Sequence, residues 1–419
     1  MVIIDECHHV SAFSTENLAS SFCAKYVYGL TATPIRRDGH QKIIFYQCGK
    51  ILFSTTSKQM NKTQNFGHYF IPRFSNFHFK PDSNANDKNR PINSYYAELV
   101  KNEARNELIA EDVKNAVKTG RTPLILSDRI EHLETLENRL KDAAKNVILI
   151  TGRGTTKQKK TQLEKLNSIP KEESLIVLAT GKYAGEGFDQ PRLDTLMLVF
   201  PFSWKGTLAQ YCGRLHRNFA GKTEVQIYDY VDFRIPVFDR MYQNRLKCYR
   251  QLGYSVKVND EKCGGQQENA RSKIYSFAEY KTDFENDLAY AKKSVTLFLP
   301  YLTKMQTQNF IHLVSKNISN GARFLVFTRR AATEETKKKQ DALILQLENA
   351  GAKAEKRNEL SQKTAIIDGK ILWYGSVNFL SAPNFPTTSP QENEECTIRI
   401  FSAAAAQEIE AEMIGKGEV

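Results

Sequence analysis

Two adjacent carboxylates close to the start of the chain could do chemistry. Asp5 and Glu6 follow a short apolar run, Val2–Ile4, which predicts a buried strand. At the end of a parallel strand such a pair can divide one task, because one carboxylate can hold Mg²⁺ through water while the other polarises an attacking water. Asp-Glu pairs are also common on solvated surfaces, so this interpretation depends on the motifs that follow.

A second motif, from Gly29 to Pro34, combines small and hydroxyl residues. Thr31 and Thr33 follow an apolar stretch at 26–30, about 25 residues after the carboxylates. Small hydroxyl residues at a strand end can connect a nucleotide site to a neighbouring surface. The alternative is an ordinary strand that ends in a proline turn.

A glycine-rich segment at 179–191 is the third motif. It follows an apolar run and contains Thr180, Gly187 and Asp189. Glycine-rich segments between apolar runs predict loops, and this one is expected directly after a strand.

The fourth motif is Gln-Tyr-Cys-Gly-Arg-Leu-His-Arg at 210–217. It places Arg214 and Arg217 three residues apart, so we expect them on one helical face. Paired guanidinium groups suit a phosphoryl group in transit, whose charge is spread over its equatorial oxygens. Most arginine pairs on helices are simply solvated, so the interpretation of this motif also depends on the other motifs.

A fifth pattern, Ser-x-Lys-x₄-Asp-x₆-Gly-Ser-x-Asn, lies near the C-terminus. Its polar residues are Ser361, Lys363, Asp368, Ser376 and Asn378. The apolar stretches between them predict two close strands, at 364–367 and 371–374.

The elements that must position these motifs alternate along the chain. In the middle block a helix face at 108–117 stops at Gly120, and further helices alternate with apolar runs of strand length. This alternation predicts a doubly wound α/β domain with a parallel sheet covered on both faces. The predicted strands are 124–126, 147–151, 175–180, 195–199 and 225–231.

Polar linkers at 81–93 and 259–273 divide the chain into three predicted domains, 1–80, 94–255 and 274–419. The aromatic-rich segment 66–79 predicts a strand pair with packed rings rather than a base-stacking platform. The last block alternates again, with strands expected at 295–299 and 324–327 and helices at 310–314 and 343–347.

The length and net charge of the chain indicate how many domains it has and which kind of partner it binds. The chain has 419 residues and a net charge of +12, which favours two to three domains and a polyanionic partner. No apolar run of about 20 residues exists, and the N-terminus lacks the flank of a signal peptide. The seven cysteines show no Cys-x-x-Cys spacing, so we expect reduced thiols in a cytoplasm.

In order and spacing, the first four motifs resemble those of superfamily 2 DEAD/DEAH-like helicases. The branch is that of type III restriction subunits and DNA-repair translocases, and the resemblance covers about residues 1–255. It implies two RecA-like parallel-sheet lobes, the first partial and the second complete. It also implies that Asp5 and Glu6 are the Mg²⁺ and ATP carboxylates, and that Thr31 and Thr33 form the coupling motif.

The same resemblance gives roles to residues of the second lobe. Thr180, Gly187 and Asp189 belong to the loop that touches the DNA backbone and the ribose of the nucleotide, and basic residues after Thr151 resemble a phosphate-gripping loop. Those basic residues could equally be a solvated helix face. The implied assignments are Thr151, Gly152, Arg153 and Thr180 for DNA, Gly187, Asp189 and Gln210 for ATP, with Gln210 as sensor, and Arg214 and Arg217 as arginine fingers.

One expected motif is missing. Motors of this class need a Gly-x-x-x-x-Gly-Lys-Ser/Thr loop to cradle phosphates. The one Gly-Lys-Thr, at 221–223, has His216 at the position of the first glycine, so we interpret it as a turn. We therefore expect the back part of a longer helicase, which binds ATP weakly and does not hydrolyse it alone. A separate N-terminal helicase fragment or a nuclease subunit would then be a partner.

The fifth pattern resembles that of the phospholipase D superfamily in every position except the first. Ser361 stands where that family has its nucleophilic histidine, and serine lacks the nucleophilicity and acidity of an imidazole. The resemblance implies an α/β phospholipase D-like domain with a degenerate phosphodiesterase site at Lys363, Asp368, Ser376 and Asn378. Such a domain would be retained for DNA binding or homodimer contacts, and His312 is expected to be a structural residue.

Three functions remain open from the sequence. The first is part of an ATP-dependent DNA helicase or translocase that uses Mg²⁺, the second a non-catalytic DNA-binding remnant, and the third a phospholipase D-type nuclease. DNA is favoured over RNA by resemblance alone, because no residue pattern reads a 2′-hydroxyl. Whether the isolated chain is an enzyme depends on the missing phosphate loop.

Overall fold

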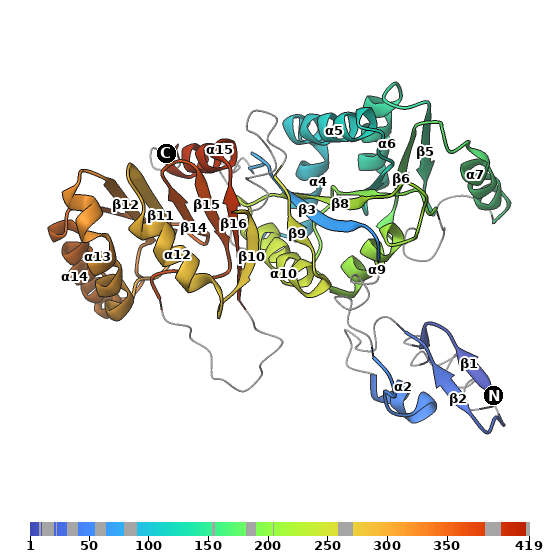
Figure 1. The fold of residues 1–419 in the computed structure, drawn as a ribbon, viewed down its shortest axis with the longest axis horizontal. Coiled ribbons are helices and arrows are strands. Elements are labelled where there is room, and N and C mark those ends of the chain that lie inside the picture. Colours follow the sequence, from blue (N-terminus) through green and yellow to red (C-terminus); the bar gives the residue numbers. More distant parts are fainter. Residues whose placement is uncertain are drawn as a thin grey trace.

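The computed structural model describes residues 1–7, 10, 21, 23–31, 41–54, 64–78, 90–152, 156–181, 190–203, 205–258, 271–381 and 395–415. These residues form a small two-stranded sheet and two seven-stranded sheets (Figure 1). None of the described helices is long and apolar enough to cross a membrane.

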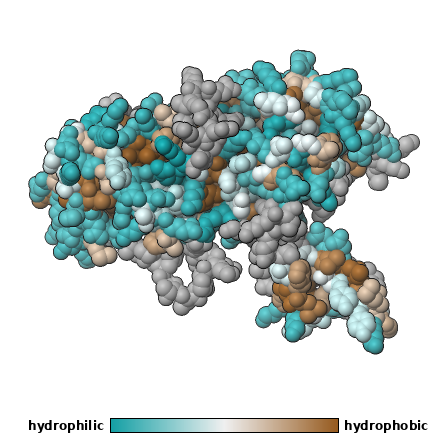
Figure 2. Space-filling view, viewed as in Figure 1, coloured by the Kyte–Doolittle hydropathy of each residue, from teal (hydrophilic) through white to brown (hydrophobic). Residues whose placement is uncertain are grey.

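The first unit contains the strands β1 (Val2–Ile4) and β2 (Val27–Gly29), which pair in parallel, and the helix α2 (Gln41–Cys48). Gly29 lies so close to α2 that a Cβ there would come within 2.9 Å of the Cys48 sulfur. Both predicted strands are confirmed, but the expectation that the first is buried is wrong, because Ile3 is 57% exposed and its neighbours are half-buried. Large apolar side chains remain exposed on this unit, where Figure 2 shows brown surface, among them Tyr46, Leu52 and Phe53.

The second sheet has the order β5-β6-β4-β7-β8-β3-β9, and all its pairs are parallel. Helices cover both faces, as the alternation of elements predicts (Figure 1). Its elements are β3 (Gly67–Phe74), α4 (Ile92–Lys101), α5 (Glu103–Lys118), β4 (Pro123–Leu126), α6 (Ile130–Leu140), β5 (Asn146–Ile150), α7 (Thr156–Ser168), β6 (Leu175–Ala179), β7 (Thr195–Leu198), α9 (Lys205–Leu215), β8 (Glu224–Val231), α10 (Pro236–Leu252) and β9 (Ser255–Val256).

Local signals explain why these elements begin and end where they do. The Asn102 side chain accepts from the Arg105 backbone N–H and so caps the start of α5. Gly120 follows the end of α5 with a positive φ of 79°, which a glycine adopts without steric cost. The strands β4 and β6 are buried at every residue, as expected of parallel strands with helices on both faces.

The strand pair predicted at 66–79 is wrong. The segment forms one strand, β3, which pairs with β8 from Gly67 to Phe74 and with β9 at Tyr69 and Phe70. The Phe70 ring also stacks on Tyr249 of α10, with centroids 4.6 Å apart. Residues 64–78 therefore belong with the second sheet and not with the block 1–80, while the other domain limits stay predictions.

The third sheet is mixed, with the order β10-β16-β15-β14-β11-β12-β13. The strands β11, β12 and β13 are parallel, and the other pairs are antiparallel. Side chains from α12, α13 and α14 pack on one face, and those from α15 pack on the other. The elements are β10 (Lys273–Ser276), α12 (Tyr280–Ala289), β11 (Ser294–Leu299), α13 (Lys304–Ser319), β12 (Arg323–Arg329), α14 (Glu334–Asn349), β13 (Lys353–Arg357), β14 (Lys363–Ile367), β15 (Ile371–Gly375), β16 (Cys396–Phe401) and α15 (Ala403–Ile414).

The second and third sheets share one hydrophobic core through α10. Phe74 of β3 lies edge to face against Tyr374 of β15, with ring centroids 5.3 Å apart. The Gln362 side-chain amide donates to the carbonyl oxygen of Phe233 at 2.8 Å, and the Tyr374 hydroxyl donates to Asp239 of α10. The two sheets are therefore packed together as a single body (Figure 1).

Candidate nucleotide and nucleic-acid site

The two carboxylates lie exposed at the end of β1. The Glu6 backbone N–H donates to the Asp5 carboxylate at 2.9 Å, and Glu6 has a positive φ of 49°. Backbone bonds from Leu30 to Ile4 and from Cys7 to Leu30 bring the residues after β2 beside this turn. The structure thus gathers Asp5, Glu6 and Thr31 at the carboxyl end of one parallel pair.

These two carboxylates fit a magnesium ion that arrives with phosphates. Mg²⁺ is commonly held by one or two carboxylates plus phosphate oxygens and water. Asp5 and Glu6 supply oxygen donors in an exposed turn, and within the described ranges no group of three or more His, Cys, Asp or Glu gathers to hold a metal. A bound ion there would neutralise phosphate charge, and Asp5 and Glu6 would hold it.

A second cluster lies at the carboxyl edge of the second sheet. The Thr180 N–H donates to the Ile150 carbonyl at 3.3 Å, which places the residues after β6 next to Thr151 after β5. A small pocket here is lined by Leu126, Ser127, Asp128, Gly181, Phe200, Phe202 and Tyr211. Residues from the ends of three strands and from α9 therefore meet at one place.

Gly181 leaves little room for a side chain in this packing. A Cβ at Gly181 would collide with the Tyr211 hydroxyl and the Asp128 carboxylate. Burial raises the pKa of both Asp128 and Tyr211 above their ordinary values. Asp128 is a site residue that the motif search missed, because a single aspartate after a strand is not a recognisable pattern.

Four of the predicted site residues lie outside the described residues. They are Thr33, Arg153, Gly187 and Asp189. Their roles in coupling, DNA contact and ATP binding stay predictions.

The helix α9 carries Gln210 and Arg214 but ends at Leu215, two residues before Arg217. The expectation that the two arginines share a helical face is therefore wrong. The helix stops because His216 N–H turns back to the Gly213 carbonyl and the following carbonyls are engaged by a lysine. Arg217 is exposed just beyond this end, and Arg214 is half-buried.

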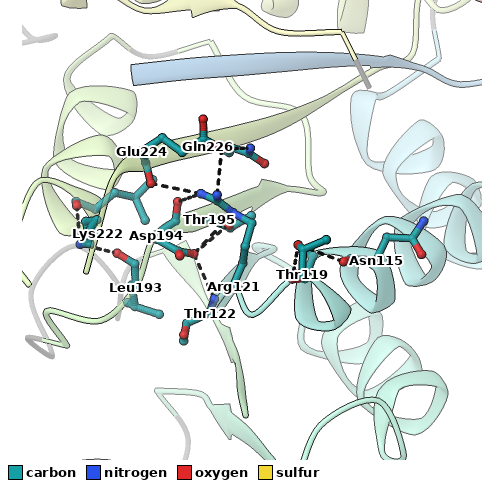
Figure 3. Close-up of polar contacts among 12 residues, drawn as sticks. Asn115, Thr119, Arg121, Thr122, Leu193, Asp194, Thr195, Lys222, Glu224 and Gln226 are labelled. Atoms are coloured by element: carbon teal, nitrogen blue, oxygen red, sulfur yellow. Dashed lines mark hydrogen bonds and ion pairs between the residues drawn. The ribbon is translucent and has the colours of Figure 1, made fainter. Parts of the chain in front are cut away.

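That lysine is Lys222, whose ammonium binds four backbone carbonyls. Its Nζ lies 2.8 Å from the Leu193 oxygen (Figure 3). It also lies 2.7 Å from the oxygen of Pro191, 2.9 Å from that of Leu215 and 2.8 Å from that of Arg217. Two of these carbonyls belong to the end of the arginine motif, and two to the segment before β7. Lys222 therefore fixes the position of Arg217 and is not a phosphate ligand.

The turn predicted at 221–223 is confirmed. Gly221 has a positive φ of 84°, and the chain then enters β8. Burial lowers the pKa of Lys222 to about 8. The negative charge of Asp194 raises this pKa in part, and the positive charge of Arg121 lowers it further. The lysine is thus charged near neutral pH while it holds the carbonyls.

Arg121 ties this clamp to the sheet. Its guanidinium donates to the Thr195 hydroxyl at 2.6 Å, to the Asp194 carbonyl at 3.0 Å and to Glu224 at 3.0 Å, as Figure 3 shows. Glu224 also receives Lys257 at 2.8 Å. The starts of β7 and β8 are thereby locked together beside Lys222.

Two histidines, the buried His68 and the half-buried His216, hold β3 against the end of α9. His216 bonds to the Tyr254 hydroxyl at 2.8 Å, and its ring meets that of His68 edge-on, with centroids 4.7 Å apart. Burial lowers the pKa of His216 to about 3 and that of His68 to about 4. Both are therefore neutral packing residues at neutral pH, and His216 within the arginine motif has a structural role.

In the third sheet, the structure brings together Lys363, Ser376 and Asn378. The Lys363 ammonium lies 3.4 Å from Glu395 and donates to the Ser376 carbonyl. The Ser376 hydroxyl bonds to the backbone of Cys396, and the Asn378 amide donates to the Tyr301 carbonyl at 3.1 Å. The protein itself occupies the groups that would hold a phosphodiester.

The structure does not bring Asp368 to this group. Asp368 follows β14 at its other end, and five residues of strand span about 16 Å. Its carboxylate accepts the backbone N–H groups of Lys292, Lys293 and Ser294 at 2.7 to 3.1 Å. Asp368 therefore organises a different edge of the sheet.

Two further expectations about this domain can be compared with the structure. His312 is exposed on α13 beside a groove between α12 and α13, so the expectation that it is a structural residue over an apolar face is wrong. Ser361 is exposed next to Gln362, which contacts the second sheet. The buried Asp239 faces Tyr374 there, and burial raises its pKa to about 6.

Comparisons with known proteins agree with this arrangement. Three family models match: the type III restriction enzyme res subunit at residues 1–36, the helicase conserved C-terminal domain at 101–219, and the cardiolipin synthase PLD-like domain at 284–415. The match to the first model includes the carboxylates, and the match to the second includes α9.

Viral proteins are among the similar sequences. The chain is 26% identical over 317 residues to a putative ATP-dependent RNA helicase of Acanthamoeba polyphaga mimivirus (74% of this chain, 56% of that protein). It is 29% identical over 269 residues to a putative helicase of Invertebrate iridescent virus 6 (61% and 56%). The chain thus spans about half the length of these relatives.

Among solved structures, UvsW of phage T4 is 18% identical, with a TM-score of 0.37, covering 62% of this chain and 53% of that one. Nuc, a phospholipase D family member from Salmonella typhimurium, is 14% identical with a TM-score of 0.27, covering 34% and 91%. From the ordered motifs and the three family matches, the chain belongs to the superfamily 2 helicases and carries a C-terminal phospholipase D-like domain.

Proposed function

We propose that this chain is the ATP-responsive, DNA-tracking part of a helicase or translocase. The observation that carries the proposal is the meeting of Thr151, Thr180 and Tyr211 of α9 at the carboxyl edge of the second sheet. Threonine hydroxyls and backbone N–H groups at strand ends suit DNA phosphates. Tyr211 lies on the same helix as Arg214 of the arginine motif, so a nucleotide-driven movement of α9 would reach the residues after β6.

ATP and Mg²⁺ are the cofactors of this proposal. Asp5 and Glu6 would hold the ion, Thr31 and Thr33 would couple the site to DNA, and Gly187, Asp189 and Gln210 would contact the nucleotide. Arg214 and Arg217 would face the phosphates, where guanidinium groups stabilise charge that develops during transfer. Glu6 has a positive φ, and such conformations cluster at functional sites.

This sequence has no Gly-x-x-x-x-Gly-Lys-Ser/Thr loop, so it supplies no backbone cradle for the β and γ phosphates. We therefore propose that the chain alone binds ATP weakly and turns it over only when a partner polypeptide supplies that loop. The exposed apolar side chains on the first unit suit contact with such a partner.

The phospholipase D-like domain is proposed to be non-catalytic. Lys363 is engaged by Glu395 and Ser376, and position 361 is a serine. A homodimer through this domain stays a prediction. The six described cysteines are all free thiols, which supports a reducing compartment such as the cytoplasm.

The test combines two assays on the purified chain. Fluorescence anisotropy with a labelled single-stranded DNA is expected to show salt-sensitive binding, and a DNA-stimulated ATPase assay is expected to show no turnover. Absence of DNA binding would overturn the proposal and leave the second and third sheets as structural modules. Ordinary ATP turnover by the chain alone would contradict the need for a partner.

A further inference from the structure

One edge of the phospholipase D-like domain carries a row of cations at the end of the sheet opposite Lys363, Ser376 and Asn378. Lys370 precedes β15, Lys292 and Lys293 precede β11, Arg323 begins β12 and Lys353 begins β13. All five side chains are exposed. We call these five residues, together with Tyr290, the amino-edge patch.

The sheet topology places these residues side by side. The strands β15, β14, β11, β12 and β13 are consecutive in the sheet, and Ser294 is in register with Arg323. With about 4.8 Å between strands, the four intervals from Lys370 to Lys353 span about 19 Å. A row of this length can face several successive phosphates of one strand.

Asp368 holds the central part of this row in place. Its carboxylate accepts from the backbone N–H groups of Lys292, Lys293 and Ser294, and its own N–H donates to the Ser294 carbonyl at 2.7 Å. Asp368 does this with a positive φ of 53°, a conformation that aspartate tolerates better than most residues. The two adjacent lysines are thus fixed through their backbone, and their side chains stay exposed.

The cations of the patch are not neutralised by the part of the protein that the structure describes. No ion pair to any of the five is found among the described residues, whereas at the opposite edge Lys356, Arg357 and Lys363 pair with Asp341, Glu355 and Glu395. The segments 290–293, 320–322, 350–352 and 368–370, which connect elements at this edge, contain one acidic residue, Asp368. This edge is therefore a positively charged surface.

An aromatic side chain lies among the cations. Tyr290 ends α12 two residues before Lys292 and is 77% exposed. An exposed ring beside lysines is the arrangement that binds single-stranded nucleic acid, because a base stacks on the ring while the phosphates meet the cations.

We propose that the amino-edge patch binds a single strand of nucleic acid, with phosphates on Lys370, Lys292, Lys293, Arg323 and Lys353 and a base on Tyr290. The proposal rests on the DNA-tracking function given above and adds a second contact, on the domain whose phosphodiesterase motif is degenerate. The strand is held by the edge opposite Lys363, Ser376 and Asn378, and of the motif residues only Asp368 takes part, by fixing the backbone of Lys292 and Lys293.

The experiment measures binding of the full chain to a fluorescent single-stranded DNA at several salt concentrations. The double replacement Lys292→Gln with Lys293→Gln removes two cations. Each lost phosphate contact is expected to lower the magnitude of the slope of log affinity against log salt by about 0.7, so the two together lower it by about 1.4. Tyr290→Ala is expected to weaken binding about tenfold without changing that slope. Circular dichroism melts confirm that the variants are folded.

The matched control is Lys338→Gln with Lys339→Gln, which removes two adjacent exposed lysines from the start of α14. This pair is expected to leave affinity and slope unchanged. Equal losses in the patch and control variants would show a general charge effect and overturn the proposal. Wild-type binding of anionic phospholipid vesicles that the patch variants lose, with unchanged DNA binding, would assign the patch to a membrane surface and overturn it too.

The two proposals fail in different ways. A wild-type chain that does not bind DNA overturns the function proposed for the second sheet. A chain whose DNA binding is weakened by Thr151→Asp but untouched by the patch variants overturns only the amino-edge site.

Discussion

The second and third sheets both have seven strands and both carry phosphate-type motifs at a strand edge, yet the motif residues are used differently. At the amino edge of the second sheet, Lys222 holds backbone carbonyls and leaves Arg217 exposed. At the motif edge of the third, Lys363 is held by Glu395 and Ser376. A motif in a sequence shows which side chains are present, and their contacts in the fold decide whether a ligand can use them.

The largest expected effect comes from breaking the clamp at the second sheet. Lys222→Met leaves four carbonyl oxygens without their donor, so we expect a loss of about 3 kcal/mol in the free energy of unfolding. DNA binding should weaken as well, because the end of α9 is released. Urea denaturation measures the first effect and anisotropy the second. Lys171→Met, at an exposed position, is the control, and an unchanged denaturation midpoint for Lys222→Met would contradict the clamp.

The contact between the two sheets predicts a pH effect of similar size. Burial raises the pKa of Asp239 from 3.8 to about 6. As pH rises through that interval the unfolded chain loses its proton first, so the free energy of unfolding falls, by at most about 3 kcal/mol at neutral pH. Asp239→Asn keeps the acceptor for Tyr374 and removes the charge, so its advantage over wild type should grow between pH 4 and pH 7. A constant difference across that range would show that Asp239 does not titrate in this way.

In the core of the second sheet, a buried histidine should lower the free energy of unfolding as pH falls, which is opposite to the effect of Asp239. His132 is buried between Ser127 and Asn106, and burial lowers its pKa to about 3. Below pH 6.5 His132 binds a proton in the unfolded chain but not in the folded chain. This residue should therefore lower the free energy of unfolding by about 2 kcal/mol at pH 5. His132→Gln should flatten that dependence in urea titrations at pH 5 and pH 7. If the free energy of unfolding changed with pH by the same amount in wild type and His132→Gln, the lowered pKa of His132 would be refuted.

The smallest effect is expected at the motif edge of the third sheet. Lys363→Met should cost about 1 kcal/mol of stability, because its ion pair with Glu395 is partly exposed. It should leave DNA affinity unchanged, since the ammonium is engaged within the protein. A clear loss of DNA affinity would make this edge a second nucleic-acid site and erase the contrast with the second sheet.

Much of the fold could be predicted from the sequence because most strands are short apolar runs between helices. The strands β4, β5, β6, β7 and β8 were all expected, and all pair in parallel. The placement of β3 could not be predicted, since its partner β8 lies far along the chain and Pro72 and Arg73 interrupt its apolar pattern. The position of β3 is therefore set by its pairing with β8 and not by its local sequence.

The candidate site shows the same division. The positions of Asp5, Glu6 and Thr31 followed from two apolar runs and a motif order. The end of α9 before Arg217 did not follow, because Lys222 acts on backbone carbonyls, which leave no trace in side-chain patterns. The separation of Asp368 from Lys363 was predictable in principle, since five residues of strand put them at opposite ends.

The most direct test of the contrast between the second and third sheets is one DNA-binding measurement on a matched pair of variants. Thr151→Asp places a negative charge at the end of β5, and Ser361→Asp places one at the motif edge of the third sheet. The account predicts that Thr151→Asp weakens single-stranded DNA binding about tenfold at low salt while Ser361→Asp binds as wild type. Equal affinities for the two variants, or a loss confined to Ser361→Asp, would contradict it.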